Sequence, residues 1–169
     1  MKRPYFVILY LLLLICQMVI YSYCQFTPLV TVSILAGMVL CIPLSIGTPL
    51  CMVIALLSGL AVDFFSEGII GLNAASLIPV AWARTGILRV YMDKDLIIRK
   101  DTFTYKKEGF GKIFTAVLTS QALFLLFYLT LDGAASRSFG LNCIHYFSSL
   151  LPSILLSLLV VNILNGSDR

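Results

Sequence analysis

The chain has 169 residues, of which 60% are hydrophobic, with a mean hydropathy of +1.00 and a formal net charge of +4. A soluble domain of this length cannot bury so large an apolar fraction, so the composition excludes an ordinary soluble protein and indicates an integral membrane protein. The positive charge does not indicate a nucleic-acid partner, because the basic residues gather in one polar segment between apolar runs, where membrane orientation accounts for them.

Long apolar stretches alternate with polar connections along the whole chain. Each stretch has about the length that a helix needs, at ~1.5 Å per residue, to cross a ~30 Å hydrocarbon layer. Continuous apolar runs favour helices over the alternating segments of a membrane barrel. The predicted fold is therefore all-α, a single polytopic membrane domain over residues 1–169. Its six predicted transmembrane helices span about residues 4–24, 29–46, 49–65, 73–91, 113–131 and 141–164.

The first apolar stretch follows Lys2 and Arg3 and superficially looks like a signal peptide. It exceeds the usual ~7–15 apolar residues and precedes no small-residue cleavage site, so we expect it to stay in the membrane. Two prolines and a glycine predict a tight turn before the third helix, with Thr48 as its N-cap. Within that helix, Ala55 and Gly59 form a small-xxx-small pair, which allows another helix to approach closely.

The fourth predicted helix begins with Asn73 as a cap and contains Pro79, which predicts a kink. The polar loop 92–112 then carries six basic and four acidic side chains. Six crossings with both termini in the cytoplasm place eleven of the twelve basic side chains on the cytoplasmic side and leave Arg137 alone outside, as the positive-inside rule requires. The loop could also contact anionic lipid headgroups, although orientation alone accounts for its charge.

Three ionisable side chains are candidates for a function. Asp63 ends the third helix, and a carboxylate there is costly unless it is hydrated or paired with a helix terminus, another subunit or a partner. Arg84 lies ~16 Å along a helix from Asn73, so its long side chain either snorkels to the cytoplasmic surface or has a role inside the membrane. His145, the only histidine, is either structural or titratable.

Catalytic and metal-binding patterns are missing from the sequence. It has no G-x-S-x-G, no H-E-x-x-H and no phosphate-binding glycine loop, and a single histidine does not make a metal cluster. The five cysteines show no C-x-x-C spacing and are interpreted as small core residues. We therefore expect no enzyme activity, no cofactor and no metal.

Two neighbouring segments resemble the signature of the rod shape-determining protein MreD family. Residues 58–66 read SGLAVDFFS and residues 71–75 read GLNAA, similar to the family's G-L-x-x-D-x-x-S pattern, short gap and G-x-x-A. The likeness extends over most of the chain, including its length and the charged loop after the fourth helix. The matched positions are Gly59, Asp63, Ser66, Gly71 and Asn73.

This resemblance implies a non-enzymatic scaffold in the bacterial inner membrane that belongs to the cell-elongation complex. Its implied direct partner is MreC, with the actin-like MreB, a SEDS-type glycan polymerase and a class B penicillin-binding protein as indirect partners. By the same analogy the fold is similar to the six-helix substrate-binding components of energy-coupling-factor vitamin transporters. On this view a groove of small residues, which includes Gly59 and Gly71, receives the single membrane helix of the partner.

Two other functions remain open from the sequence. A vitamin- or small-solute-binding subunit of a transporter needs a cavity at the membrane midplane with converging polar groups, for which the first and last helices offer mainly Gln17, Ser153, Ser157 and Asn162. An intramembrane enzyme would have to use Asp63 or His145.

Overall fold

The computed structural model describes residues 3–23, 30–65, 69–91, 110–133 and 139–166. Within these ranges every regular element is an α-helix, which confirms the all-α class. The helices are α1 (Arg3–Tyr23), α2 (Leu35–Cys41), α3 (Thr48–Phe65), α4 (Leu72–Tyr91), α7 (Phe110–Gly133) and α8 (Phe139–Gly166).

Four of these helices, α1, α3, α7 and α8, are long and apolar enough to cross a membrane. Their outward faces carry large exposed aliphatic and aromatic side chains, such as Leu11 on α1 and Leu155 on α8. An apolar surface of this kind is stable against hydrocarbon and unstable against water. The chain is thus built as a membrane protein, with polar side chains collected in its interior.

Helix ends agree with the predicted boundaries within about three residues for α1, α3, α4, α7 and α8. Two predicted caps are wrong. The carbonyl of Gly47 accepts the N–H of Cys51 at 3.0 Å, so Gly47 caps α3 and Thr48 is its first helical residue. The hydroxyl of Thr48 does not cap the helix but lies 3.3 Å from the hydroxyl of Thr85. Asn73 is the second residue of α4 rather than its cap.

The predicted helix over residues 29–46 is wrong. Only α2, seven residues long, is helical in this region, and residues 30–34 form an irregular segment before it. Seven residues extend only ~10 Å, far less than a hydrocarbon layer. The irregular segment reads VTVSI, and its β-branched side chains lower the helix propensity of this stretch.

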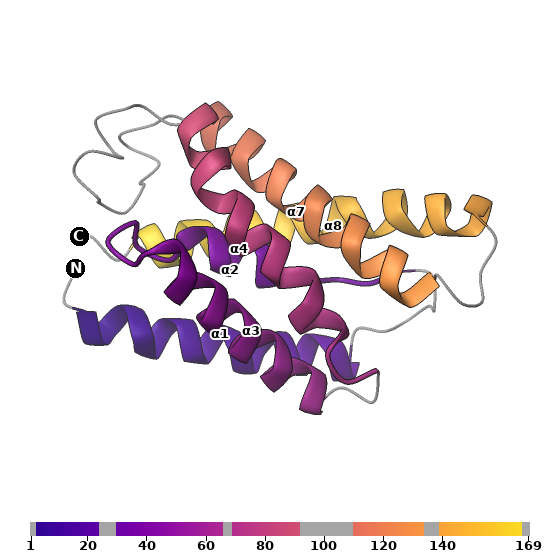
Figure 1. Ribbon diagram of the computed structural model, residues 1–169, viewed down its shortest axis with the longest axis horizontal. Coiled ribbons are helices and arrows are strands. Elements are labelled where there is room, and N and C mark those ends of the chain that lie inside the picture. Colours follow the sequence, from indigo (N-terminus) through magenta and orange to yellow (C-terminus); the bar gives the residue numbers. More distant parts are fainter. Residues whose placement is uncertain (1–2, 24–29, 66–68, 92–109, 134–138, 167–169) are drawn as a thin grey trace.

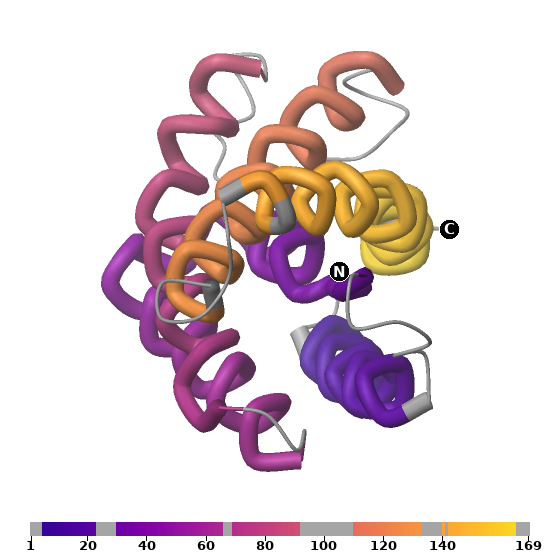
Figure 2. The backbone as a smooth tube through the Cα atoms, turned by 90° about the vertical axis from the view of Figure 1, so that its right-hand side faces the viewer, coloured from indigo at the N-terminus to yellow at the C-terminus, as the bar shows by residue number. Residues whose placement is uncertain are grey.

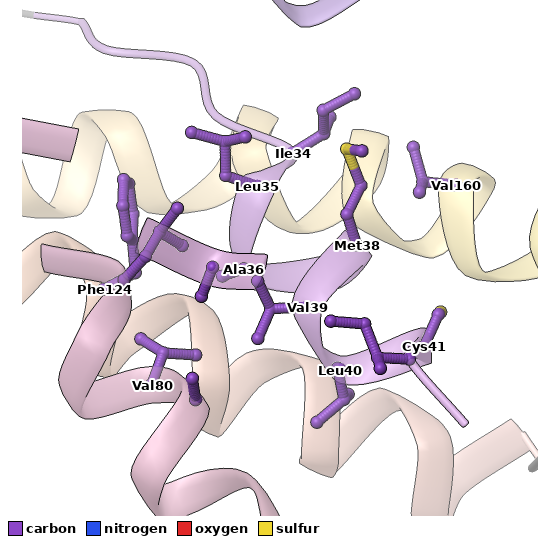
Figure 3. Packing of buried hydrophobic residues seen from close by; sticks show 14 of the residues in the cluster. Ile34, Leu35, Ala36, Met38, Val39, Leu40, Cys41, Val80, Phe124 and Val160 are labelled. Atoms are coloured by element: carbon purple, nitrogen blue, oxygen red, sulfur yellow. The ribbon is translucent and has the colours of Figure 1, made fainter. Parts of the chain in front are cut away.

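α2 lies at the centre of the molecule, where all seven of its residues are buried. It packs against α4, α7 and α8, while α3 packs mainly against α4 (Figures 1 and 2). Figure 3 shows its apolar side chains, among them Met38 and Val39, next to Val80 of α4, Phe124 of α7 and Val160 of α8. α1 lies at the periphery and contacts α3 and α8. The start of α1 and the end of α8 lie at the same end of the molecule (Figure 1).

Candidate functional site

Asp63, at the end of α3, caps the N-terminus of α4. Its side chain is only 2% exposed. Carboxylate oxygen Oδ2 accepts the backbone N–H groups of Gly71 at 3.0 Å and Ala74 at 3.2 Å, while Oδ1 accepts the N–H of Asn73 at 3.2 Å and its amide Nδ2 at 2.8 Å. The positive end of a helix dipole favours a carboxylate in this position. The sequence left open whether Asp63 is hydrated or paired with a helix terminus, another subunit or a partner. In the structure it is paired with a helix terminus.

Two glycines allow this cap to form. Gly71 has φ +97°, a left-handed conformation that side chains disfavour, and its carbonyl accepts the first helical N–H, from Ala75, at 2.8 Å. Gly59 is buried against α4: a Cβ there would lie 2.4 Å from Cα of Ala74 and 2.6 Å from its backbone nitrogen. We call Gly59, Asp63, Gly71, Asn73 and Ala74 the α3–α4 joint.

The joint is connected to two further helices through Asn73. The hydroxyl of Tyr21 on α1 donates to the amide oxygen of Asn73 at 3.4 Å and lies 3.2 Å from the hydroxyl of Tyr128 on α7. Ala55, one turn before Gly59, is fully buried and its carbonyl accepts the hydroxyl of Ser58 at 2.9 Å. The predicted site residue Ser66 lies outside the described residues.

Replacing Asp63 by alanine is expected to lower the free energy of unfolding by about 1–3 kcal/mol, because three backbone N–H groups at a buried helix end lose their acceptor. Asp63→Asn retains one oxygen and should fall between alanine and wild type. Thermal unfolding of the purified protein in detergent checks this order. Equal stability of Asp63→Ala and wild type would show that the cap contributes nothing to the fold.

A second polar group surrounds the irregular segment before α2, and serines of α8 supply part of it. The N–H of Thr31 donates to Oγ of Ser149 at 2.9 Å, and the N–H of Ser33 donates to Oγ of Ser153 at 3.2 Å. The hydroxyl of Ser153 in turn donates to the carbonyl of Thr31 at 3.3 Å. His145, which is 3% exposed, places Nε2 3.0 Å from Oγ1 of Thr31.

Two glutamines complete the hydrogen bonds of this segment. Gln17 of α1 accepts the N–H of Ile34 at 2.8 Å and donates to the carbonyl of Val32 at 3.2 Å. Gln121 of α7 donates to the carbonyl of Ser33 at 2.9 Å. Irregular backbone at membrane depth is stable only where such groups are satisfied within the protein. Side chains from three helices therefore replace the backbone hydrogen bonds that a continuous helix would have made.

α2 itself is held at both ends. Near its start, a Cβ at Gly37 would lie 2.9 Å from Cβ of Ser157, whose hydroxyl donates to Gln121 at 3.2 Å. At its C-terminal end, Arg84 of α4 donates from Nε to the carbonyl of Leu40 at 3.3 Å and from Nη2 to that of Ile42, the residue after the helix.

Arg84 is 2% exposed and its Nη1 also lies 3.9 Å from Sγ of Cys51, so the side chain points into the molecule. The interpretation that it snorkels to the cytoplasmic surface is wrong. A cation at the C-terminal end of a helix is stabilised by the carbonyls and the dipole there, and this arrangement offsets part of the cost of burying the guanidinium.

The polar stripe on α8 has a signal in the sequence. His145, Ser149, Ser153 and Ser157 follow one another at intervals of four residues, which places them on one face of a helix. Neither Ser149 nor Gln121 on α7 belongs to a known motif. For Ser149, the four-residue spacing of the stripe is the only signal in the sequence, and it becomes informative once a buried polar group, here the backbone N–H of Thr31, is known to face it.

In the part of the chain that the structure describes, no three His, Cys, Asp or Glu side chains are grouped closely enough to hold a metal ion. The buried polar side chains bond mainly to backbone groups of neighbouring elements and so act as connectors. Comparison with models of protein families, with curated proteins and with solved structures gives no match.

Proposed function

We propose that this chain is a non-enzymatic membrane scaffold of the bacterial cell-elongation complex, which binds MreC and thereby helps to regulate peptidoglycan synthesis and cell shape. One observation carries the proposal. Four of the five positions that match the MreD signature, Gly59, Asp63, Gly71 and Asn73, lie together in the α3–α4 joint, although they are spread over 15 residues of sequence. Each of the four has a role in this contact that its residue type supplies: the glycines permit a close approach and a left-handed backbone, and the carboxylate is bonded to the amide of Asn73.

The proposal includes six membrane crossings in the inner membrane, with both termini in the cytoplasm. The second crossing is then made by residues 30–34 and α2 together, which is compatible with a bilayer because the irregular backbone is enclosed by protein. Arg89 in the last turn of α4 and Lys112 in the first turn of α7 fit the positive-inside rule in this orientation. The proposal also includes a fold similar to that of the substrate-binding components of energy-coupling-factor transporters.

The site at which MreC docks has to differ from the small-residue groove inferred from the sequence. Ala55 and Gly59 are buried, and α4 already fills the space in front of Gly59. The membrane helix of MreC would therefore contact an outward-facing surface of the bundle. MreB, the SEDS polymerase and the class B penicillin-binding protein are indirect partners in this proposal.

The converging polar groups that a vitamin-binding subunit requires do occur, on α1, α7 and α8. They bind the backbone of residues 31–34, so this cluster does not favour a solute site over a structural one. Calorimetric titration of purified protein with vitamins would separate the two functions, since a scaffold gives no saturable heat.

Depletion of the protein from a rod-shaped host is expected to produce round cells, and re-expression of the wild-type chain should restore rods. Tagged wild-type protein should also co-purify MreC from solubilised membranes, whereas an unrelated polytopic protein with the same tag should not. Rods that persist after complete depletion, or equal recovery of MreC with the control, would contradict the proposal.

A further inference from the structure

Four large apolar side chains flank the connection between α3 and α4. Phe64 and Phe65 end α3, while Ile69 and Ile70 stand just before α4, and each side chain is between 63% and 75% exposed. The two phenyl rings contact each other edge to face, with centroids 5.5 Å apart. We call these four residues the α3–α4 tip. So much apolar surface in one place is unfavourable in water, so an apolar phase or an apolar partner has to cover it.

The start of α4, next to this tip, is bonded as if no water reached it. The first N–H groups of a helix have no partner within the helix and often bond to water. Here five consecutive backbone N–H groups, from residue 71 to residue 75, all have acceptors inside the protein. Three bond to Asp63, one to the carbonyl of Ile69 at 3.2 Å and one to the carbonyl of Gly71 at 2.8 Å. A helix start of this kind is stable in hydrocarbon, where an unpaired N–H group is costly.

The length of α4 indicates where the tip lies across the membrane. Arg89 in its last turn is exposed, so this charge belongs at one edge of the hydrocarbon layer. Gly71 precedes Arg89 by 18 residues, which is ~27 Å of helix against a hydrocarbon layer of ~30 Å. α4 also runs obliquely to α1, which is seen nearly end-on in Figure 2, so it covers less of the layer than its full length (Figures 1 and 2). The tip therefore stops at or inside the opposite edge of the hydrocarbon.

The sequence limits how deep the tip can lie. It has one charge between the two halves of the tip, Glu67, and a carboxylate is costly in hydrocarbon unless it reaches the headgroups. The depth that satisfies both this charge and the length of α4 is the upper part of the acyl chains, just below the headgroups.

We propose that the α3–α4 tip is immersed in the membrane and contacts lipid acyl chains just below the headgroups, so that α3 and α4 form a hairpin whose turn stays within the membrane. Lipid fits this surface better than a protein partner does. All four side chains are apolar, and the N–H groups beside them are already bonded, so the tip offers these groups to no partner. The inference is independent of the proposed role in cell elongation.

Tryptophan fluorescence in proteoliposomes tests the depth of the tip. Trp82, the only tryptophan of the chain, is first replaced by phenylalanine. In this background Ile70→Trp should be quenched by lipids that carry bromine near the top of the acyl chains, about as strongly as Trp82 is quenched in the unmodified chain. Iodide, present on both sides of the membrane, should quench it only weakly.

The start of α8 supplies the matched control in water. This helix has 28 residues, or ~42 Å, and exceeds the hydrocarbon thickness. Its second residue, Gly140, lies toward the same end of the molecule as the tip, and nothing lies within 4 Å of a Cβ built there. Gly140→Trp in the same background should show the reverse pattern, with strong quenching by iodide and little by the brominated lipids.

A second tip position and a stability measurement complete the experiment. Phe64→Trp should give the same quenching pattern as Ile70→Trp, and both should unfold in detergent at the temperature of the Trp82→Phe parent, because the replaced side chains are 75% and 72% exposed. Iodide quenching of both variants as strong as that of Gly140→Trp would overturn the proposal. Protection of both from iodide and from brominated lipid would overturn it too, since a partner or a second copy would then cover the tip.

Discussion

Replacing Gly59 by leucine is expected to force α3 and α4 apart and to unfold the protein at a much lower temperature than wild type. Even the Cβ of an alanine would lie 2.4 Å from Cα of Ala74, a contact with backbone that no side-chain rotation relieves. Overpacking of a well-packed contact costs about 1–3 kcal/mol, and leucine adds three more carbon atoms at the same point. The shift would also lengthen the bond from Ala74 to Asp63, so packing and capping would fail together.

Gly86 of α4 provides the matched control, because nothing lies within 4 Å of a Cβ built there. Gly86→Leu should leave thermal unfolding in detergent near the wild-type value, while Gly59→Leu should lower it strongly. Recovery of MreC is measured on both variants at equal membrane levels. If Gly59→Leu unfolded like wild type and lost only MreC, the position would face a partner, and the close contact with Ala74 would be wrong.

The long helices could be predicted from the sequence because the length of each apolar run is sufficient to indicate a transmembrane helix. A charge-free run of about 20 residues has few stable alternatives in a bilayer, since only a helix satisfies its own backbone. For this reason α1, α3, α7 and α8 appear where the runs of apolar residues occur, with end positions altered by a few residues.

The region around α2 could not be predicted in the same way, because its backbone partners are distant in sequence. Ser33 donates to Ser153, 120 residues later, and accepts from Gln121, 88 residues later. A window of sequence around residue 33 contains neither partner. It contains only an apolar run rich in β-branched residues. The hydropathy of this run favours a transmembrane helix, whereas the low helix propensity of β-branched residues opposes one.

The two buried charges show what the sequence could and could not establish. The cost of a charge at membrane depth singles out Asp63 and Arg84 without any structure. What satisfies each charge depends on helix crossings: Asp63 meets the N-terminus of α4, and Arg84 meets the C-terminal end of α2. The second of these could not be foreseen, because α2 was expected to continue past the carbonyls that Arg84 binds.

Arg84→Met is expected to lower the free energy of unfolding by about 2–5 kcal/mol, the second large effect in this protein. Methionine replaces much of the buried stem but donates nothing, so the carbonyls of Leu40 and Ile42 lose the guanidinium at a fully buried helix end. Arg84→Lys keeps the positive charge, yet a compact ammonium lacks the planar fork that reaches both carbonyls. Lysine should therefore recover only part of the loss.

Arg89, five residues further along α4 and exposed, is the matched control. Arg89→Met removes the same charge from the same helix. A change in thermal unfolding that both variants share would therefore come from the lost charge or from an altered orientation in the membrane. A change confined to the Arg84 variant would come from the lost bonds to α2. Unchanged stability of Arg84→Met would mean that α2 ends without this donor. In that case the guanidinium, buried without benefit to the fold, would have to be retained for a bound anion or a partner.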